Sequence, residues 1–290
     1  MNIQIITSSY PAFAGDPGGT AGLFVEAFAC ELQHRGHTVI VQPVQRKTAY
    51  TPARGITIEP IPWDGGDQVL STMNIYDPRN WPVFWNFFKN GRANTAAIHK
   101  KHAIDHTLCM WVIPSGIFGY WIFTDLGKNY DVWALGSDIW KIRHIPVAGE
   151  RLIKKVVHNA AQVYADGQQL CADVSHITDR DCSFLSSSRV LPAPSAAPLP
   201  QDKQKIKLLF VGRYHTNKGP DLLLDALLFL EEDVRAKIQV DIFGLGELEG
   251  ELHTACQENG LETFVKMHGP INAQDLANRL QEAQYLLIPS

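Results

Sequence analysis

Hydrophobic and polar positions alternate in blocks along the chain, and the first blocks predict a strand, a helix and a second strand. Residues 3–7 form a short apolar run that ends in polar Ser-Ser-Tyr-Pro, which is typical of a buried strand. Over residues 21–35 the apolar positions fall on one helical face, and Gly36 stands where a helix C-cap needs a positive φ. Residues 38–44 form the next apolar run. This β–loop–α–β order indicates the start of a doubly wound parallel sheet.

The pattern is more regular after residue 205, where short apolar runs alternate with amphipathic stretches. The expected strands cover residues 207–212, 238–244, 264–269 and 285–289. The expected helices cover residues 221–230 and 247–258, and a third helix is capped by Asn272 and runs to about residue 283. Strands that alternate with helices of this length predict a parallel sheet with crossover helices.

A proline-rich stretch separates these two parts. Residues 191–204 read LPAPSAAPLPQDKQ, and each proline removes an amide donor and restricts the residue before it. We expect an N-terminal Rossmann-like domain over residues 1–190, a linker over 191–205 and a C-terminal Rossmann-like domain over 206–290. A chain of 290 residues suits two such α/β domains with a cleft between them.

Composition narrows the possible partners and the compartment. Apolar residues make up 45% and charged residues 19% of the chain, which is normal for a globular protein. The formal charge of −4 lacks the basic excess of a nucleic-acid-binding protein. Five widely spaced cysteines without a C-x-x-C pair predict reduced thiols in a cytoplasmic protein. Neither a signal peptide nor a membrane span is expected, because the chain has no basic leader and no long apolar run.

Two loops at predicted strand ends could bind an anion, since open parallel sheets bind ligands beyond the carboxyl ends of their strands. Residues 15–22, GDPGGTAG, combine glycines with the start of a helix, whose free N–H groups attract phosphate. Residues 212–219, GRYHTNKG, place Arg213 after a strand and Lys218 before a helix. Arginine can clamp a phosphate with two hydrogen bonds, and lysine adds a point charge. A flexible surface loop and a solvated basic pair remain the alternatives.

A third loop, FGLGELEG at residues 243–250, imitates a dinucleotide fingerprint. Its spacing is G-x-G-x-x-x-G, and Met267-His268-Gly269 follows the next strand where an NAD ribose would need a carboxylate. Both features disfavour an NAD-linked enzyme. The glycines still allow a ligand to pass close to the backbone.

Taken together, these segments resemble family 4 retaining glycosyltransferases, which have the GT-B architecture of two facing Rossmann-like domains. The resemblance is strongest in VGRYHTNKGPDLLLDAL, DIFGLGELEGEL and VKMHGPINAQDLANRLQEAQYLLIPS, and it includes the GG-T loop, RGHTVIV and WALGSDIW. It covers nearly the whole chain and is loosest between residues 45 and 105. It implies a hexosyltransferase-type enzyme that moves a sugar from a nucleotide-diphosphate donor to a hydroxyl of a glycan or lipid-linked acceptor, with retention.

The resemblance also implies roles for particular residues. Arg213 and Lys218 match the basic pair that holds the donor diphosphate and acts in catalysis. The other donor-binding positions that it implies are Gly212, Gly244, Gly246, Pro270 and Ile271. Gly18 and Gly19 match the loop near the phosphates and the acceptor. Cations placed at a departing diphosphate stabilise the transition state, so no metal ion is expected as a cofactor.

Asp138, in the turn Gly136-Ser137-Asp138, has two interpretations. Its carboxylate could accept hydrogen bonds from acceptor hydroxyls, as a member of the acceptor site. It could equally cap the helix that follows, which is a structural role. The sequence leaves both open.

The chain departs from the family at two places. Leu135 stands where the family has a histidine before Gly-Ser-Asp, and a histidine of the preceding strand is replaced by Met110 or Trp111. The chain also ends at Ser290, where the family continues with a Glu-rich segment, so the second domain is expected to be incomplete. Residues 285–289 would then form an unprotected sheet edge. We therefore expect weak or no transfer activity from the 290-residue form, and a non-catalytic nucleotide-sugar-binding protein is the alternative.

Two further clusters carry less specific signals. His99, His102 and His106 have the spacing of a metal site on a helix, but the strand-like pattern near His106 disfavours it. Residues 81–92, WPVFWNFFKNGR, place large aromatic side chains beside Lys89 and Arg92. A peripheral membrane contact, an acceptor groove and ordinary core packing all remain open for this segment.

Overall fold

The computed structural model describes residues 1–13, 16–51, 55–66, 68, 70, 73–188, 190–195 and 205–289. The chain divides into two compact units, Met1–Arg189 and Val190–Ser290. Residues 196–204 of the expected linker lie outside the described residues. None of the helices in the described part of the chain is both long and apolar enough to cross a membrane.

Unit 1 is a doubly wound α/β domain. Its strands are β1 (Asn2–Thr7), β2 (Thr38–Pro43), β3 (Thr57–Ile58), β4 (His106–Met110), β5 (Tyr130–Ala134), β6 (Val163–Ala165) and β7 (Ser183–Phe184). Its helices are α1 (Leu23–His34), α2 (Trp81–Lys101), α3 (Ser115–Leu126), α4 (Ser137–Trp140), α5 (Gly149–Asn159) and α6 (Gln168–Thr178), with short 3₁₀ helices η1 (Pro17–Gly22), η3 (Pro78–Asn80) and η4 (Ile142–His144). The strands pair in parallel in the order β3-β2-β1-β4-β5-β6-β7.

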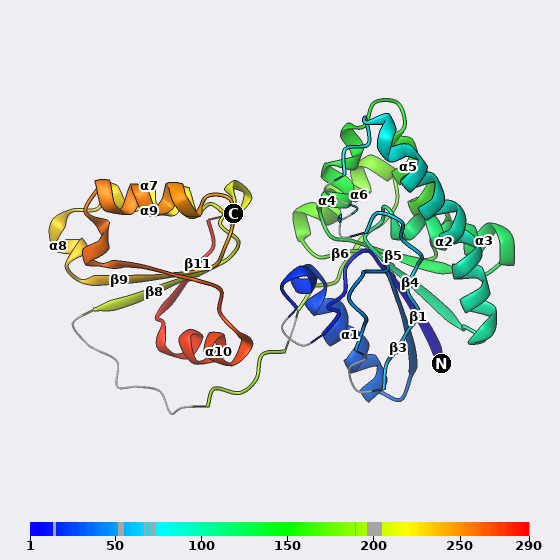
Figure 1. Cartoon of the computed structure of the whole chain (residues 1–290), viewed down its shortest axis with the longest axis horizontal. Helices are drawn as coiled ribbons and strands as arrows, with labels where there is room; N and C mark the ends of the chain where they lie inside the picture. The colour runs from blue at the N-terminus through cyan, green and yellow to red at the C-terminus, as the bar shows by residue number, and fades with distance from the viewer. Residues whose placement is uncertain are drawn as a thin grey trace. The chain divides into compact units, whose positions relative to one another are not determined.

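The core of unit 1 lies on both faces of this sheet because successive residues of a strand point to opposite sides. On β4, Leu108 and Met110 join the cluster beneath α1, whereas Cys109 joins the cluster beneath α2, α3, α5 and α6. Figure 1 shows α1 apart from the group of α2, α3 and α5. Parallel pairing then brings the loops after β1, β4 and β5 to the same edge, so the sequence order of the strands positions the candidate site.

Unit 2 repeats the arrangement on a smaller scale. Its parallel strands β8 (Ile206–Val211), β9 (Ile238–Phe243), β10 (Val265–His268) and β11 (Tyr285–Leu287) pair in the order β10-β9-β8-β11. Its helices are α7 (Pro220–Leu228), α8 (Glu232–Arg235), α9 (Glu249–Glu258) and α10 (Ala273–Glu282), with 3₁₀ helices η5 (Thr216–Lys218) and η6 (Leu261–Thr263). Figure 1 shows α7 and α9 on one face of the sheet and α10 on the other.

Several local expectations are confirmed. The side chain of Asn272 caps α10 by accepting a hydrogen bond from the backbone N–H of Asp275 at 2.8 Å. Gly36 has a φ of +87°, which favours glycine. The helix expected over residues 21–35 is α1, but the chain enters it through η1, a 3₁₀ turn that the hydrophobic pattern does not reveal.

The three histidines have separate surroundings. His99 is buried inside α2, and burial lowers its pKa. His102 contacts Glu59 at 3.1 Å, and His106, at the start of β4, contacts Asp131 at 3.0 Å. Among the residues that the structure describes, no three acidic, histidine or cysteine side chains form a group that could hold a metal ion.

Candidate functional site

The loop between β8 and α7 presents the two expected cations. Arg213 and Lys218 are both exposed, and neither side chain forms a hydrogen bond or ion pair with any residue that the structure describes. A Cβ atom built on Gly212 would lie 3.8 Å from the Cβ of Lys218, so the end of η5 turns back over the end of β8. The two cations therefore start from neighbouring points of one turn at the carboxyl edge of the sheet.

Glycines allow this loop to pack against the loop that follows β9. A Cβ on Gly244 would lie 1.9 Å from the carbonyl oxygen of Gly212, and one on Gly246 would lie 2.2 Å from that of Tyr214. No side chain fits at either distance. Gly244 and Gly246, which the resemblance places beside a nucleotide, are needed because the two loops touch at these positions. A search for ligand motifs does not reveal this contact.

Tyr214 links all three loops at this edge. Its backbone N–H donates to the carbonyl of Leu245 at 2.9 Å, and its own carbonyl accepts from Leu248 N at 3.1 Å. Its buried hydroxyl lies 2.6 Å from the carbonyl oxygen of His268 and 3.1 Å from that of Ile242. No motif in the sequence marks Tyr214, although it lies directly after Arg213.

Pro270 and Ile271 lie on the loop between β10 and α10. Gly269, immediately before them, accepts a hydrogen bond from Gly244 N at 3.2 Å, which joins this loop to the β9 loop. Pro270 is exposed and Ile271 is half-buried. Unit 2 therefore brings together the loops that carry Gly212, Arg213, Lys218, Gly244, Gly246, Pro270 and Ile271.

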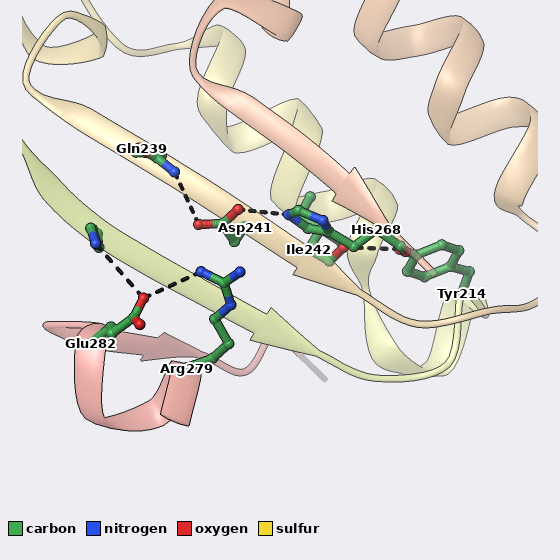
Figure 2. Close-up of polar contacts among 8 residues, drawn as sticks. Tyr214, Gln239, Asp241, Ile242, His268, Arg279 and Glu282 are labelled. Atoms are coloured by element: carbon green, nitrogen blue, oxygen red, sulfur yellow. Dashed lines mark hydrogen bonds and ion pairs between the residues drawn. The ribbon is translucent and has the colours of Figure 1, made fainter. Parts of the chain in front are cut away.

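A polar array supports the last of these loops from the sheet face covered by α10. Figure 2 shows Asp241 between Gln239 and His268. The Asp241 carboxylate accepts from Gln239 Nε2 at 3.1 Å and contacts His268 Nε2 at 2.7 Å. The His268 ring stacks on Phe243 with centroids 4.3 Å apart. The sequence contains one signal for this array. Gln239 and Asp241 are polar residues at alternate positions of β9, which is otherwise apolar.

In unit 1, the glycine loop is η1. Gly18 and Gly19 lie within it, and a Cβ on Gly19 would come within 2.3 Å of Pro11 Cα, so η1 packs tightly on the segment after β1. Buried Asp16 holds the start of η1, because its Oδ2 accepts from the Ala12 N–H at 2.8 Å and its carboxylate pairs with Arg46. Gly15 and the residue before it lie outside the described residues.

The Asp138 side chain is buried and hydrogen-bonded to the backbone. It is only 2% exposed, and its oxygens accept from the backbone N–H groups of Val112 at 2.6 Å and Leu135 at 3.0 Å. The carboxylate thus ties the segment after β4 to the segment after β5, and it does not cap α4. Burial raises its pKa to about 7, although the two amides favour the charged form. The contact with acceptor hydroxyls expected from the sequence stays a prediction.

Met110 and Trp111, the two residues that could stand where the resemblance places a histidine, have different surroundings. Met110 is fully buried in the core, whereas half-buried Trp111 lies just beyond the end of β4. Trp111 has a φ of +67°, a strained value for a bulky side chain, and its ring lies 5.8 Å from that of Phe24. The strained backbone places the half-buried Trp111 ring against Phe24 at the carboxyl edge of a central strand.

Comparison with known proteins agrees with this geometry. Residues 195–290 match the model of the family Glycosyl transferases group 1. The chain is 33% identical over 100 residues to D-inositol 3-phosphate glycosyltransferase of Arthrobacter sp. (strain FB24), a stretch that covers 33% of this chain and 24% of that protein. It is 31% identical over 87 residues to amylovoran biosynthesis glycosyltransferase AmsK of Erwinia amylovora, which covers 30% and 21%. The matched stretch thus spans about a quarter of these relatives.

Solved structures match over the whole chain. The lipopolysaccharide outer core galactosyltransferase WaaB superposes with a TM-score of 0.66 at 16% identity, covering 100% of this chain and 74% of that one. Sucrose-phosphate synthase of Thermosynechococcus elongatus gives 0.68 at 16% identity, with 100% and 75% covered. TarM of S. aureus, solved with UDP and α-GlcNAc-glycerol, gives 0.61 at 12% identity, with 100% and 81% covered. The fold is therefore the α/β fold of two Rossmann-like domains found in GT-B glycosyltransferases.

Proposed function

We propose that this protein is a retaining glycosyltransferase of hexosyltransferase type that moves a sugar from a nucleotide-diphosphate donor to a hydroxyl of a glycan or glycolipid. The observation that carries the proposal is the pair Arg213 and Lys218, exposed on one turn at the carboxyl edge of a parallel sheet. The pair lies within the stretch that matches Glycosyl transferases group 1. The similarity in fold to a protein solved with UDP supports the same class of donor.

The chemistry follows from the charge that develops on the leaving group. As the glycosidic bond breaks, negative charge grows on the diphosphate. Arg213 can offer two parallel N–H donors to it, and Lys218 adds a positive charge close by. The diphosphate is already an anion in the bound donor, and it gains further negative charge as the bond breaks. Two cations at the sheet edge therefore stabilise the transition state more than the ground state. We propose that they do so without a metal ion.

A binding protein without transfer activity is the second candidate. Leu135 stands where the resemblance places one histidine, and Met110 or Trp111 stands where it places another. None of these side chains can act as an acid or a base in catalysis. Donor binding by unit 2 would not depend on any of them. Binding and transfer therefore have to be measured separately.

We propose a cytoplasmic location on the basis of the reduced cysteine pattern.

Donor binding is tested with calorimetry on the wild type and three variants, using UDP, GDP and NAD. We expect UDP or GDP to bind, and Arg213→Ala and Lys218→Ala each to weaken that binding by about tenfold or more, the loss of one charge-assisted contact. Lys266→Ala is the matched control, because Lys266 is an exposed lysine of the same unit on β10. Unchanged affinity in Arg213→Ala would refute the assigned role.

Transfer is tested by incubating the protein with nucleotide sugars and following release of the free nucleotide. The anomeric configuration of the product, read by NMR, then decides between retention and inversion. Nucleotide binding without release of nucleotide would favour the binding protein. Binding of NAD alone would remove both proposals.

A further inference from the structure

His268, the last residue of β10, is held through both its side chain and its backbone. Its ring nitrogen Nε2 lies 2.7 Å from a carboxylate oxygen of Asp241 on β9, and its ring stacks on Phe243 with 8° between the two planes. Its carbonyl oxygen lies 2.6 Å from the hydroxyl of Tyr214, which belongs to the loop after β8. Figure 2 shows the ring directed toward Asp241 and the backbone toward Tyr214. One residue therefore joins β9, β10 and the β8 loop.

The position of β10 in the sheet makes these contacts necessary. Within the part of the chain that the structure describes, β10 pairs with β9 alone, and this pairing ends at His268, opposite Phe243. An edge strand is hydrogen-bonded to a neighbour on one side only. Contacts at its last residue therefore fix the point from which the next loop begins.

The pair of Asp241 and His268 fixes a direction that apolar packing would not. The His268 side chain is 33% exposed and that of Asp241 is 12% exposed. The second carboxylate oxygen of Asp241 accepts a hydrogen bond from Gln239 Nε2 at 3.1 Å, so both of its oxygens have a partner. An apolar ring at position 268 could still pack on Phe243, but it could not be held by the carboxylate. The contacts thus set the orientation of the ring as well as its position.

The loop that starts at His268 is short and is fixed again at its far end. The carbonyl of Gly269 accepts a hydrogen bond from Gly244 N at 3.2 Å, and Asn272 caps α10 three residues later. Pro270, which is exposed, and Ile271, which is half-buried, lie between these two anchors. A displacement of His268 would therefore reach these two apolar residues directly.

The strand order places this loop at a suitable distance from the two cations of unit 2. The β9 loop lies between the β8 loop and the β10 loop. Neighbouring strands are about 4.8 Å apart, so the β10 loop begins about 10 Å from the loop of Arg213 and Lys218. A nucleotide whose diphosphate is bound by these cations can extend past the glycines of the β9 loop. Pro270 and Ile271 then offer apolar side chains to its flat base.

We propose that His268 is a positioning residue that sets which nucleotide base the protein prefers, because its contact with Asp241 fixes the loop of Pro270 and Ile271. The proposal rests on the proposed function, since it places the base of the donor at this loop. It adds what determines the choice between donors, which is the position of the loop and not the two cations. His268 acts through the loop and needs no contact with the donor.

The test compares the affinities for two nucleotides. Calorimetry gives the dissociation constants of UDP and GDP for the wild type and for variants whose thermal midpoint shows that they are folded. His268→Phe keeps a ring on Phe243 but loses the contact with Asp241, and Asp241→Leu removes the carboxylate instead. His268→Gln keeps a side chain that can donate a hydrogen bond to Asp241. His253→Phe is the matched control, because His253 is an exposed histidine on α9.

We expect His268→Phe and Asp241→Leu each to weaken binding of the preferred nucleotide by about tenfold and to reduce the ratio of the two dissociation constants by about fivefold. His268→Gln should restore most of this ratio, and His253→Phe should bind like the wild type. Arg213→Ala should weaken both nucleotides by the same factor and leave the ratio unchanged, because the diphosphate is common to both.

Three results would overturn this proposal and leave the proposed function in place. They are an unchanged ratio in whichever of His268→Phe and Asp241→Leu is folded, an equal loss of affinity for both nucleotides in that variant, and a wild type that binds UDP and GDP equally well. A wild type that binds neither nucleotide would instead refute donor binding itself, and this proposal with it.

Discussion

The hydroxyl of Tyr214 lies 2.6 Å from the carbonyl oxygen of His268, across the carboxyl ends of β8, β9 and β10. These residues are 54 positions apart in the chain. The contact fixes the end of β10 relative to the loop that carries Arg213. The backbone next to Arg213 is therefore fixed by the same residue that joins the ends of these strands.

Replacing Tyr214 with phenylalanine should reduce stability through this contact alone. We expect Tyr214→Phe to lower the free energy of unfolding by about 1–2 kcal/mol, because a buried carbonyl loses its donor. Urea denaturation measures the change. Tyr285→Phe is the control, since Tyr285 is an exposed tyrosine of the same sheet, and it should change stability by less than about 0.5 kcal/mol. Equal effects would show that the hydroxyl contact of Tyr214 contributes nothing.

Adding a single methyl group at Gly244 should separate two loops. Its Cβ would lie 1.9 Å from the Gly212 carbonyl oxygen, so we expect Gly244→Ala to cost about 2 kcal/mol or more and to weaken UDP or GDP binding. Gly250→Ala, on α9 with open space around its Cβ, is the control and should stabilise the protein by up to about 1 kcal/mol. A Gly244→Ala variant with wild-type stability would contradict the packing argument.

Asp138 should make stability depend on pH. The pKa of Asp138 is about 7 in the folded protein, above the ordinary value of 3.8 expected in the unfolded chain. At pH values between these two, the folded protein keeps a proton on Asp138 that the unfolded chain has lost. The contribution of Asp138 to stability is therefore fully present at low pH and is lost as pH rises toward 7. From about pH 4.5 to 7, the wild type should lose at least about 1 kcal/mol more than Asp138→Asn. Parallel pH profiles for the two proteins would refute the shifted pKa.

The two tryptophans beside Phe24 should respond differently to substitution. Trp133→Ala removes a buried, unstrained ring and should cost about 3–5 kcal/mol. Trp111→Asn loses a half-buried ring, but asparagine tolerates a φ of +67°, so relief of strain offsets part of the loss. We expect it to cost at least about 2 kcal/mol less than Trp133→Ala in urea denaturation. Equal costs would mean that the backbone at Trp111 stores no strain.

Sugar transfer should survive removal of divalent metal ions. If Arg213 and Lys218 neutralise the departing diphosphate, EDTA should leave the rate of nucleotide release within about twofold of its value without chelator. Dialysis against EDTA followed by the release assay measures this. A loss that Mg²⁺ or Mn²⁺ restores would show that the two cations are insufficient, without affecting their role in binding.

The sequence by itself determined the fold class and the position of the loops that we propose bind the donor. Alternating apolar runs and amphipathic helices require parallel sheets, and parallel sheets bring strand-end loops to one edge. Arg213 and Lys218 could thus be placed in the loop between one predicted strand and the helix that follows it. The cap at Asn272 followed in the same way, because local hydrogen bonding decides it.

Contacts between segments distant in the chain were decided only by the tertiary structure. Two backbone amides bind the buried Asp138 carboxylate between the segments that follow β4 and β5, and its place in the sequence did not reveal these contacts. Gly244 matched a nucleotide turn, yet its Cβ position is occupied by the Gly212 carbonyl. The aromatic segment of α2 separated into core and surface only when Phe118 packed on one side of the helix. Periodicity specifies which residues share a face of an element, but not what that face meets, because packing depends on residues from the whole unit.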